Sequence, residues 1–156
     1  MKLAIASDHA GFEYKEKLKQ HLAEKGHEAV DFGTDSGDNT DYPCYIHPAA
    51  EAVARGECER GIVLGGSGNG EAITANRLPG IRCTLCWNND SARLARYHNN
   101  SNMLSMGARL IDFATAERIV DIWLETPFKG GCHKRRIDLI DNVKERSEPC
   151  SQPDRL

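Results

Sequence analysis

The chain has 156 residues, of which 40% are hydrophobic and 28% charged, a length and balance that suit one folded domain with a buried core. Its formal net charge of -3 argues against nucleic acid or an anionic membrane as the main partner. The apolar run in the first residues, MKLAIASDHAG, is too short for a secretory signal, and no later stretch is long enough to span a bilayer, so we expect a cytoplasmic protein.

Short apolar runs that favour strands alternate with segments of helical spacing along the chain. In chain order the pattern predicts strand 3–6, helix 12–25, strand 29–32, a loop at 33–43, helix 46–55, strand 61–64, helix 71–78, strand 81–87, helix 90–97, strand 102–106, helix 114–124 and helix 135–145. This alternation predicts a parallel sheet with helices on both faces. Without a linker or internal repeat, residues 1–146 should form a single domain, followed by a polar tail at 147–156.

In parallel α/β sheets the ligand site lies beyond the carboxyl ends of the strands. The motifs at those ends are SDHAG, GGSGNGE, WNND and SMGAR, so we expect the functional residues to gather there. The glycine-rich motif, Gly65–Glu71, is the most informative, because glycines let main-chain N–H groups converge on an anion. It lacks the Lys-Ser/Thr of a nucleotide-binding P-loop, and it follows the third strand, unlike a dinucleotide fingerprint.

Glu71 limits which anion could bind at this motif. Its carboxylate would repel a phosphate dianion, but it suits an enediolate, which forms after a base has removed a proton. Glu71 is therefore a candidate general base, with the N–H groups of Ser67 to Gly70 stabilising the oxyanion. The alternative is that Glu71 only favours the helix dipole and the glycines only form a tight turn.

Other charged and polar residues are candidates for proton transfer or phosphate binding. Asp8 and His9 could exchange protons with a sugar, or Asp8 could simply cap the following helix. His98 could protonate a ring oxygen, or it could belong to an ordinary helix end. Arg109 and the basic segment at 134–136 could bind phosphate, although such clusters are more often solvated.

The cysteines give little sign of a disulfide framework or a metal site. There are six, and we expect ordinary reduced thiols, because no secretory signal accompanies them. Cys83 and Cys86 form a C-x-x-C pair, but on a strand they should point to opposite faces. No convincing ligand set is present, so neither metal nor organic cofactor is expected.

Taken together, five motifs resemble the type B ribose-5-phosphate isomerases, in the family that also holds galactose-6-phosphate isomerase. They are SDHAGFEYKEKL, DYP at 41–43, GGSGNGEAITANRLPGIRC, HNNSNMLSMGAR and CHKRRID, and they span residues 3 to about 140 in family order. The resemblance implies a three-layer α/β/α sandwich, Rossmann-like, with a five-stranded parallel sheet. It also implies a sugar phosphate as substrate and a homodimer or tetramer with active sites shared between subunits.

The resemblance also assigns roles by position. The catalytic residues would be Asp8, Ser67, Glu71 and His98. The substrate-binding residues would be Asp8, His9, Tyr42, Gly66, Ser67, Gly68, Asn69, Gly70, Asn99, Arg109 and Arg136. His98 would open the furanose ring with Asp8, and Glu71 would then move a proton between C2 and C1 through a cis-enediolate.

Two departures from the family pattern matter. Many members have a cysteine base where this chain has Ser67, so the base should be Glu71, as in the subgroup with GGSGNGE. Cys132 stands where members usually have an arginine, so either Lys134 or Arg135 compensates, or the substrate differs from ribose 5-phosphate. The alternatives are a tetrose, galactose or allose phosphate as substrate, a non-catalytic phosphate- or nucleotide-binding module, and a thiol redox protein.

Overall fold

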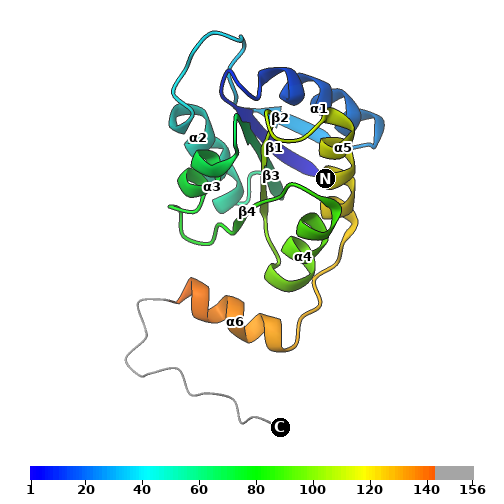
Figure 1. Ribbon diagram of the computed structural model, residues 1–156. Coiled ribbons are helices and arrows are strands. Elements are labelled where there is room, and N and C mark those ends of the chain that lie inside the picture. The colour runs from blue at the N-terminus through cyan, green and yellow to red at the C-terminus, as the bar shows by residue number, and fades with distance from the viewer. Residues whose placement is uncertain (143–156) are drawn as a thin grey trace.

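The computed structural model describes residues 1–142 of the chain. The predicted domain end at residue 146 and the predicted tail at 147–156 lie outside them. A central sheet has its strands in the order β2-β1-β3-β5-β4, and all neighbouring strands are parallel (Figure 1). The strands are β1 (Lys2–Ser7), β2 (Glu28–Asp31), β3 (Arg60–Gly65), β4 (Cys83–Leu85) and β5 (Met103–Gly107).

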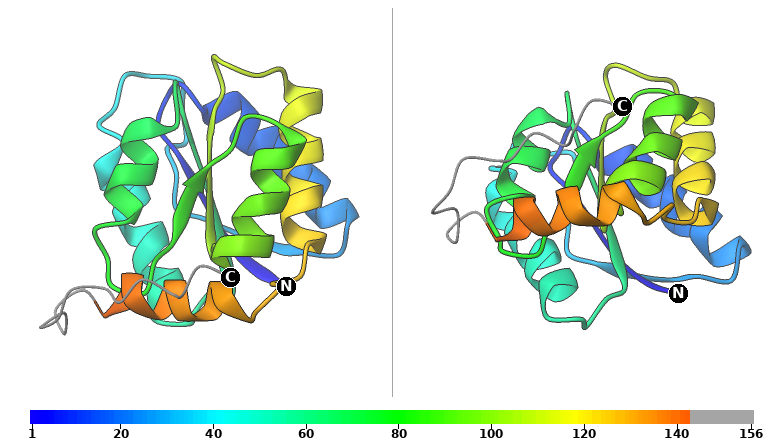
Figure 2. Two further views of the ribbon diagram at one scale, coloured as in Figure 1. Left: turned by 60° about the horizontal axis from the view of Figure 1, so that its bottom comes forward. Right: turned by 90° about the horizontal axis from the view of Figure 1, so that it is seen from below.

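Helices cover both faces of this sheet, as the alternating sequence pattern predicted. They are α1 (Phe12–Glu24), α2 (Pro43–Ala54), α3 (Asn69–Ala75), α4 (Asn89–Asn99), α5 (Phe113–Glu125) and α6 (Cys132–Asp141). In Figures 1 and 2, α2 and α3 cover one face, and α1, α4 and α5 cover the other. The predicted three-layer α/β/α fold with a five-stranded parallel sheet is therefore confirmed.

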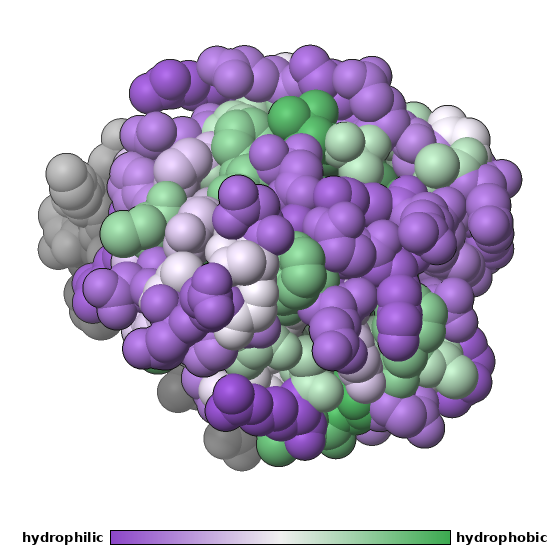
Figure 3. All heavy atoms as spheres, turned by 90° about the horizontal axis from the view of Figure 1, so that it is seen from above, coloured by the Kyte–Doolittle hydropathy of each residue, from purple (hydrophilic) through white to green (hydrophobic). Residues whose placement is uncertain are grey.

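Two hydrophobic cores flank the sheet. One joins Leu18 and Leu22 of α1 to Ile119 and Trp123 of α5, and the other packs residues of α2 such as Ile46 against β1 and β3. The strands β1 and β3 are buried along almost their whole length, which explains their uninterrupted apolar sequence. The outer surface seen in Figure 3 is mostly hydrophilic, with small hydrophobic patches between polar side chains.

The last helix, α6, lies away from the three layers along the amino-terminal edge of the sheet (Figure 2). It is held there by the buried side chain of Ile137 and by an ion pair between Arg82 and Asp141, whose Nη1 and Oδ2 atoms are 2.9 Å apart. The imidazole rings of His98 on α4 and His133 on α6 stack with centroids 4.4 Å apart. The sequence predicted the helix but not this position.

Several element boundaries differ from the prediction. Helix α2 begins at Pro43, which we had placed in the loop, because proline lacks an N–H and fits the first turn of a helix. Helix α6 begins at Cys132 rather than near Arg135, after Gly131 with a φ of 59°. Strand β4 is only 3 residues long, because it is an edge strand that pairs with β5 alone.

Five of the six cysteines lie in the described part of the chain, and Cys150 lies outside it. Cys44, Cys58, Cys83, Cys86 and Cys132 are all free thiols. Cys83 belongs to the core under α2, whereas Cys86 belongs to the core under α5. The two thiols of the C-x-x-C pair therefore lie on opposite faces of the sheet.

No helix among residues 1–142 is long and apolar enough to cross a membrane.

Candidate active site

The glycine-rich loop connects β3 to α3 at the carboxyl edge of the sheet. Gly68 has a φ of 79°, and a Cβ there would lie 2.6 Å from Leu85 Cδ1 and 2.8 Å from the main-chain carbon of Met106. The position therefore requires glycine both for its left-handed backbone and for its close approach to β5. The buried Ser105 Oγ donates a hydrogen bond to the Gly68 carbonyl oxygen over 2.6 Å, which fixes the loop against the sheet.

Glu71 lies in the first turn of α3, and its side chain turns back over the end of β3. The residue is only 4% exposed, yet it lines an open cavity of about 490 Å³. Burial raises the pKa of the Glu71 carboxyl above its ordinary value, and the charge of Asp8 raises it further, although a hydrogen bond from its own main-chain N–H acts in the opposite direction. A buried carboxyl whose pKa is raised in this way is suited to accepting a proton from a substrate.

The SDHAG motif lies beside Glu71, directly after β1. Asp8 Oδ1 accepts hydrogen bonds from the main-chain N–H groups of Ala10 (2.9 Å) and Gly11 (3.2 Å), so this carboxylate fixes the turn before α1. His9 Nδ1 lies 3.8 Å from Asp8 Oδ2 and accepts a hydrogen bond from the N–H of Thr40 over 3.2 Å. That bond favours the neutral tautomer with its proton on Nε2, which leaves Nε2 as a donor.

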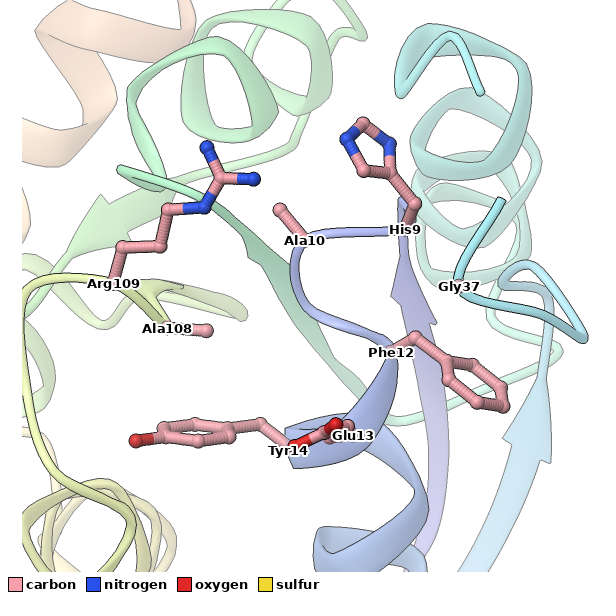
Figure 4. Close-up of a pocket in the computed structure, with 8 residues that line it drawn as sticks. All are labelled: His9, Ala10, Phe12, Glu13, Tyr14, Gly37, Ala108 and Arg109. Atoms are coloured by element: carbon pink, nitrogen blue, oxygen red, sulfur yellow. The ribbon is translucent and has the colours of Figure 1, made fainter. Parts of the chain in front are cut away.

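Arg109 supplies the positive charge at this edge of the sheet. Its main-chain N–H donates to the Gly66 carbonyl oxygen over 3.1 Å, which ties the loop after β5 to the glycine loop. Its side chain extends over Gly66, where a Cβ would lie 3.5 Å from Arg109 Cδ and Nη1. Figure 4 shows the Arg109 and His9 side chains on either side of Ala10, at the same end of a neighbouring cavity.

Most of the predicted site residues meet in one cavity. The lining residues are Asp8, His9, Ala10, Tyr42, Gly66, Ser67, Gly70, Glu71, Arg109 and Leu110. Ala10 and Leu110 were missed, since neither side chain carries chemistry that a sequence pattern could reveal. A second cavity of about 580 Å³ shares His9, Ala10 and Arg109 with the first and continues towards Glu13 and Tyr14 of α1 (Figure 4).

Tyr42 closes the side of the cavity next to α3. It stands just before Pro43, and its ring lies so close to Gly70 that a Cβ there would be 2.6 Å from Tyr42 Cζ. Gly70 therefore lets the aromatic ring pack against the start of α3. Gly68 and Asn69, which were also predicted to bind substrate, do not line the cavity: Gly68 is buried against β5 and Asn69 is exposed.

Three predicted site residues lie at the amino-terminal ends of the strands, whereas the cavity lies at the carboxyl ends. His98 and Asn99 end α4, and the guanidinium of Arg82, which directly precedes β4, donates to the Asn99 carbonyl oxygen over 3.2 Å. Arg136 lies on α6, along the same amino-terminal edge. Glu71 follows the carboxyl end of β3, so within one chain the sheet separates it from these residues. The resemblance alone had assigned all of them to one site.

The local structure around these residues also matches the simpler interpretations of the sequence. Asn100 ends α4 in the left-handed conformation, with a φ of 45°, so the helix end that includes His98 is an ordinary C-cap. Cys132 is exposed at the first position of α6, and the Lys134 ammonium donates to Asp138 Oδ1 over 2.5 Å. Among residues 1–142, no three His, Cys, Asp or Glu side chains cluster in a way that could hold a metal ion.

Comparisons with known proteins agree with the fold and the motifs. Residues 3–140 match the family model described as Ribose/Galactose Isomerase. The chain is 42% identical to ribose-5-phosphate isomerase B of Escherichia coli, over 93% of this chain and 97% of the relative. The structure of the Clostridium thermocellum ribose-5-phosphate isomerase B superposes with a TM-score of 0.91 at 42% identity, covering 95% of this chain and 100% of the other. That of the Thermotoga maritima enzyme has a TM-score of 0.87 at 51% identity, covering 90% and 97%.

Proposed function

Since the chain belongs to the ribose/galactose isomerase family, we propose that it is an aldose-ketose isomerase that interconverts ribose 5-phosphate and ribulose 5-phosphate. The observation that carries this proposal is the buried Glu71 carboxyl, which lines a cavity beside a loop of main-chain amides. A base and an anion-stabilising loop at one point are what proton transfer next to a carbonyl requires.

The proposed reaction begins with opening of the furanose ring, assisted by Asp8 and by an imidazole. In the open aldose, Glu71 removes the proton from C2, and the electrons move onto the carbonyl oxygen at C1 to give a cis-enediolate. The main-chain N–H groups of Ser67 and Gly70, two loop residues that line the cavity, stabilise the negative oxygen. A proton passes from the C2 hydroxyl to the C1 oxygen, and Glu71 returns its proton to C1 while the C2 oxygen becomes the new carbonyl, which gives the ketose and restores the carboxylate.

Phosphate recognition is assigned to the positive and donor groups at the outer end of the cavity. Arg109 can bind two phosphate oxygens with its guanidinium, and His9 can donate from Nε2. Glu71 lies deeper, near the end of β3, so its charge is separated from the phosphate dianion. This division agrees with a carboxylate that acts on the carbonyl end of the sugar.

We further propose that the working form is at least a homodimer. His98, Asn99 and Arg136 lie at the amino-terminal edge of the sheet, too far around the fold to serve Glu71 of the same chain. If these residues take part, a second copy must bring its amino-terminal edge to the cavity of the first. In a two-fold symmetric pair, both cavities would be completed in the same way.

The replacement Glu71→Gln tests the central step. Glutamine keeps the size of the side chain but cannot accept the proton, so we expect kcat for ribose 5-phosphate to fall by about 10²–10⁴-fold while KM changes little. A coupled assay of ribulose 5-phosphate formation measures both constants, and circular dichroism checks the fold. Glu57→Gln, the same change at an exposed residue outside the cavity, is the matched control. Full activity in Glu71→Gln would refute the proposed role.

A further inference from the structure

Gly65 is the last residue of β3, and the Glu71 carboxyl group occupies the space where its side chain would be. An ideal Cβ built on Gly65 would lie 1.8 Å from Glu71 Oε1, 2.2 Å from Cδ and 2.7 Å from Oε2. Real Cβ atoms essentially never approach other heavy atoms so closely. The carboxyl can therefore fold back over the end of the strand only because residue 65 has no side chain.

We propose that Gly65 is a positioning residue for the Glu71 carboxylate, and that its missing Cβ creates the recess in which this group is held for proton transfer. This inference rests on the proposed function of Glu71. On this proposal, the position of the Glu71 carboxylate depends on β3 as well as on α3, the helix that carries it.

Neighbouring glycines show that the requirement at Gly65 is of a different kind. A Cβ at Gly107 would lie 2.7 Å from the main-chain carbon of Ser67, and one at Gly11 would lie 2.8 Å from that of Leu64. Those two glycines are needed for the backbone to pack. At Gly65 the nearest atoms all belong to the end of one flexible side chain, and the φ angle is not in the left-handed region. Alanine at position 65 should therefore displace the carboxyl and leave the backbone in place.

The surroundings of the carboxyl indicate where it would go. Two buried residues are electrostatic neighbours of this carboxyl. The charge of Asp8, after β1, raises the pKa of Glu71, and the charge of Glu71 adds to the burial that raises the pKa of the Cys83 thiol on β4. The open side of the recess is the cavity itself, where the other charged or titratable lining residues are His9, Tyr42 and Arg109. A methyl group at position 65 would push the carboxyl outwards into this cavity, which is open to solvent.

The replacement Gly65→Ala tests the inference. We expect kcat to fall about 100-fold with KM nearly unchanged, because a displacement of about 1 Å is enough to spoil the reacting geometry. The acidic limb of the kcat/KM profile should also move to lower pH, because a carboxyl that leaves the recess loses the burial that raises its pKa. A purely structural role would leave this limb where it is.

Gly61→Ala is the matched control, on the same strand and facing the same side of the sheet. A Cβ at Gly61 would meet only flexible side-chain ends, 2.9 Å from Met103 Cε and 3.1 Å from Val53 Cγ2, in the core away from the cavity. Any general effect of a methyl group on β3 should appear in this variant too. We expect it to keep the wild-type pH profile and to lose less than about threefold in kcat, because it does not touch Glu71.

A comparison of the stabilities of single and double variants tests the inference even if Gly65→Ala folds poorly. Glu71→Ala removes the carboxyl that would collide with the new methyl group. The double variant Gly65→Ala/Glu71→Ala should therefore have nearly the same free energy of unfolding as Glu71→Ala alone, as measured by urea unfolding. An equal loss of stability in both backgrounds would place the conflict elsewhere and overturn the inference. Wild-type kcat and pH profile in Gly65→Ala would do the same, provided that Glu71→Gln is inactive. If Glu71→Gln is active, the proposed function itself fails.

Discussion

At the residue scale, the features that suit Glu71 for catalysis oppose the stability of the fold. Its carboxyl is buried, faces the charge of Asp8, and has a raised pKa. A group that binds its proton more tightly in the folded state than in the unfolded state stabilises the fold at low pH only. That contribution is complete below the unfolded pKa and is lost as the pH rises through the folded pKa.

A pH-dependent stability difference between wild type and Glu71→Gln follows from this linkage. The glutamine variant cannot ionise, so its free energy of unfolding relative to wild type should rise as the pH increases from the ordinary pKa of a glutamate, about 4.5, through the raised pKa of Glu71. Urea unfolding at several pH values measures the difference. Glu57→Gln, at an exposed position, should show no comparable trend. A constant difference across this range would mean that the Glu71 carboxyl is not held in an unfavourable environment.

The sequence identified residues that carry chemistry better than those that shape the space around them. Asp8, His9 and Glu71 were predicted to gather, because motifs after parallel strands meet at one edge of the sheet. Leu110 was missed, since nothing marks an exposed leucine as part of a cavity. The recess at Gly65 was also hidden, because it depends on the direction of one side chain on another element.

At the element scale, a capping residue or a proline marks where a helix starts. Asn88 and Ser91 form a reciprocal capping box at the start of α4. Pro43 marks the start of α2, three residues before the start at residue 46 that the apolar spacing predicts. Strand β4 proved shorter than its apolar run, because the length of an edge strand depends on its single neighbour.

The capping box at Asn88 can be tested by mutation. Asn88 Oδ1 accepts the Ser91 N–H over 2.8 Å, and Ser91 Oγ lies 3.1 Å from the Asn88 nitrogen. Asn88→Ala should lower the free energy of unfolding by about 1 kcal/mol, because it leaves the Ser91 N–H without its side-chain acceptor. Asn89→Ala, one residue further into the helix, is the control and should change it by less than about 0.5 kcal/mol. Chemical denaturation compares the two, and equal effects would contradict a specific cap.

At the scale of the whole molecule, the sequence predicted the layers of the fold but not the separation of the site residues. Strand and helix periodicity defines which segments form the sheet and its cover. Because a helix between two parallel strands runs back to the amino-terminal edge, the pattern places the end of α4 there, but it says nothing about the position of α6. His98 and Arg136 were grouped with Glu71 by resemblance, although α4 ends and α6 lies at the edge opposite the cavity. A second copy of the chain reconciles the two observations.

Mixed dimers test this arrangement. Glu71→Gln and His98→Asn should each be nearly inactive as homodimers, because every cavity then lacks one proposed catalytic group. In a mixed dimer, one cavity would combine the intact Glu71 of one chain with the intact His98 of the other, and the second cavity would lack both. Dimers carrying two different affinity tags, purified on both, should therefore show about half the wild-type activity. If Glu71 and His98 instead acted within the same chain, every cavity would be defective and the mixed dimer would stay as inactive as its parents.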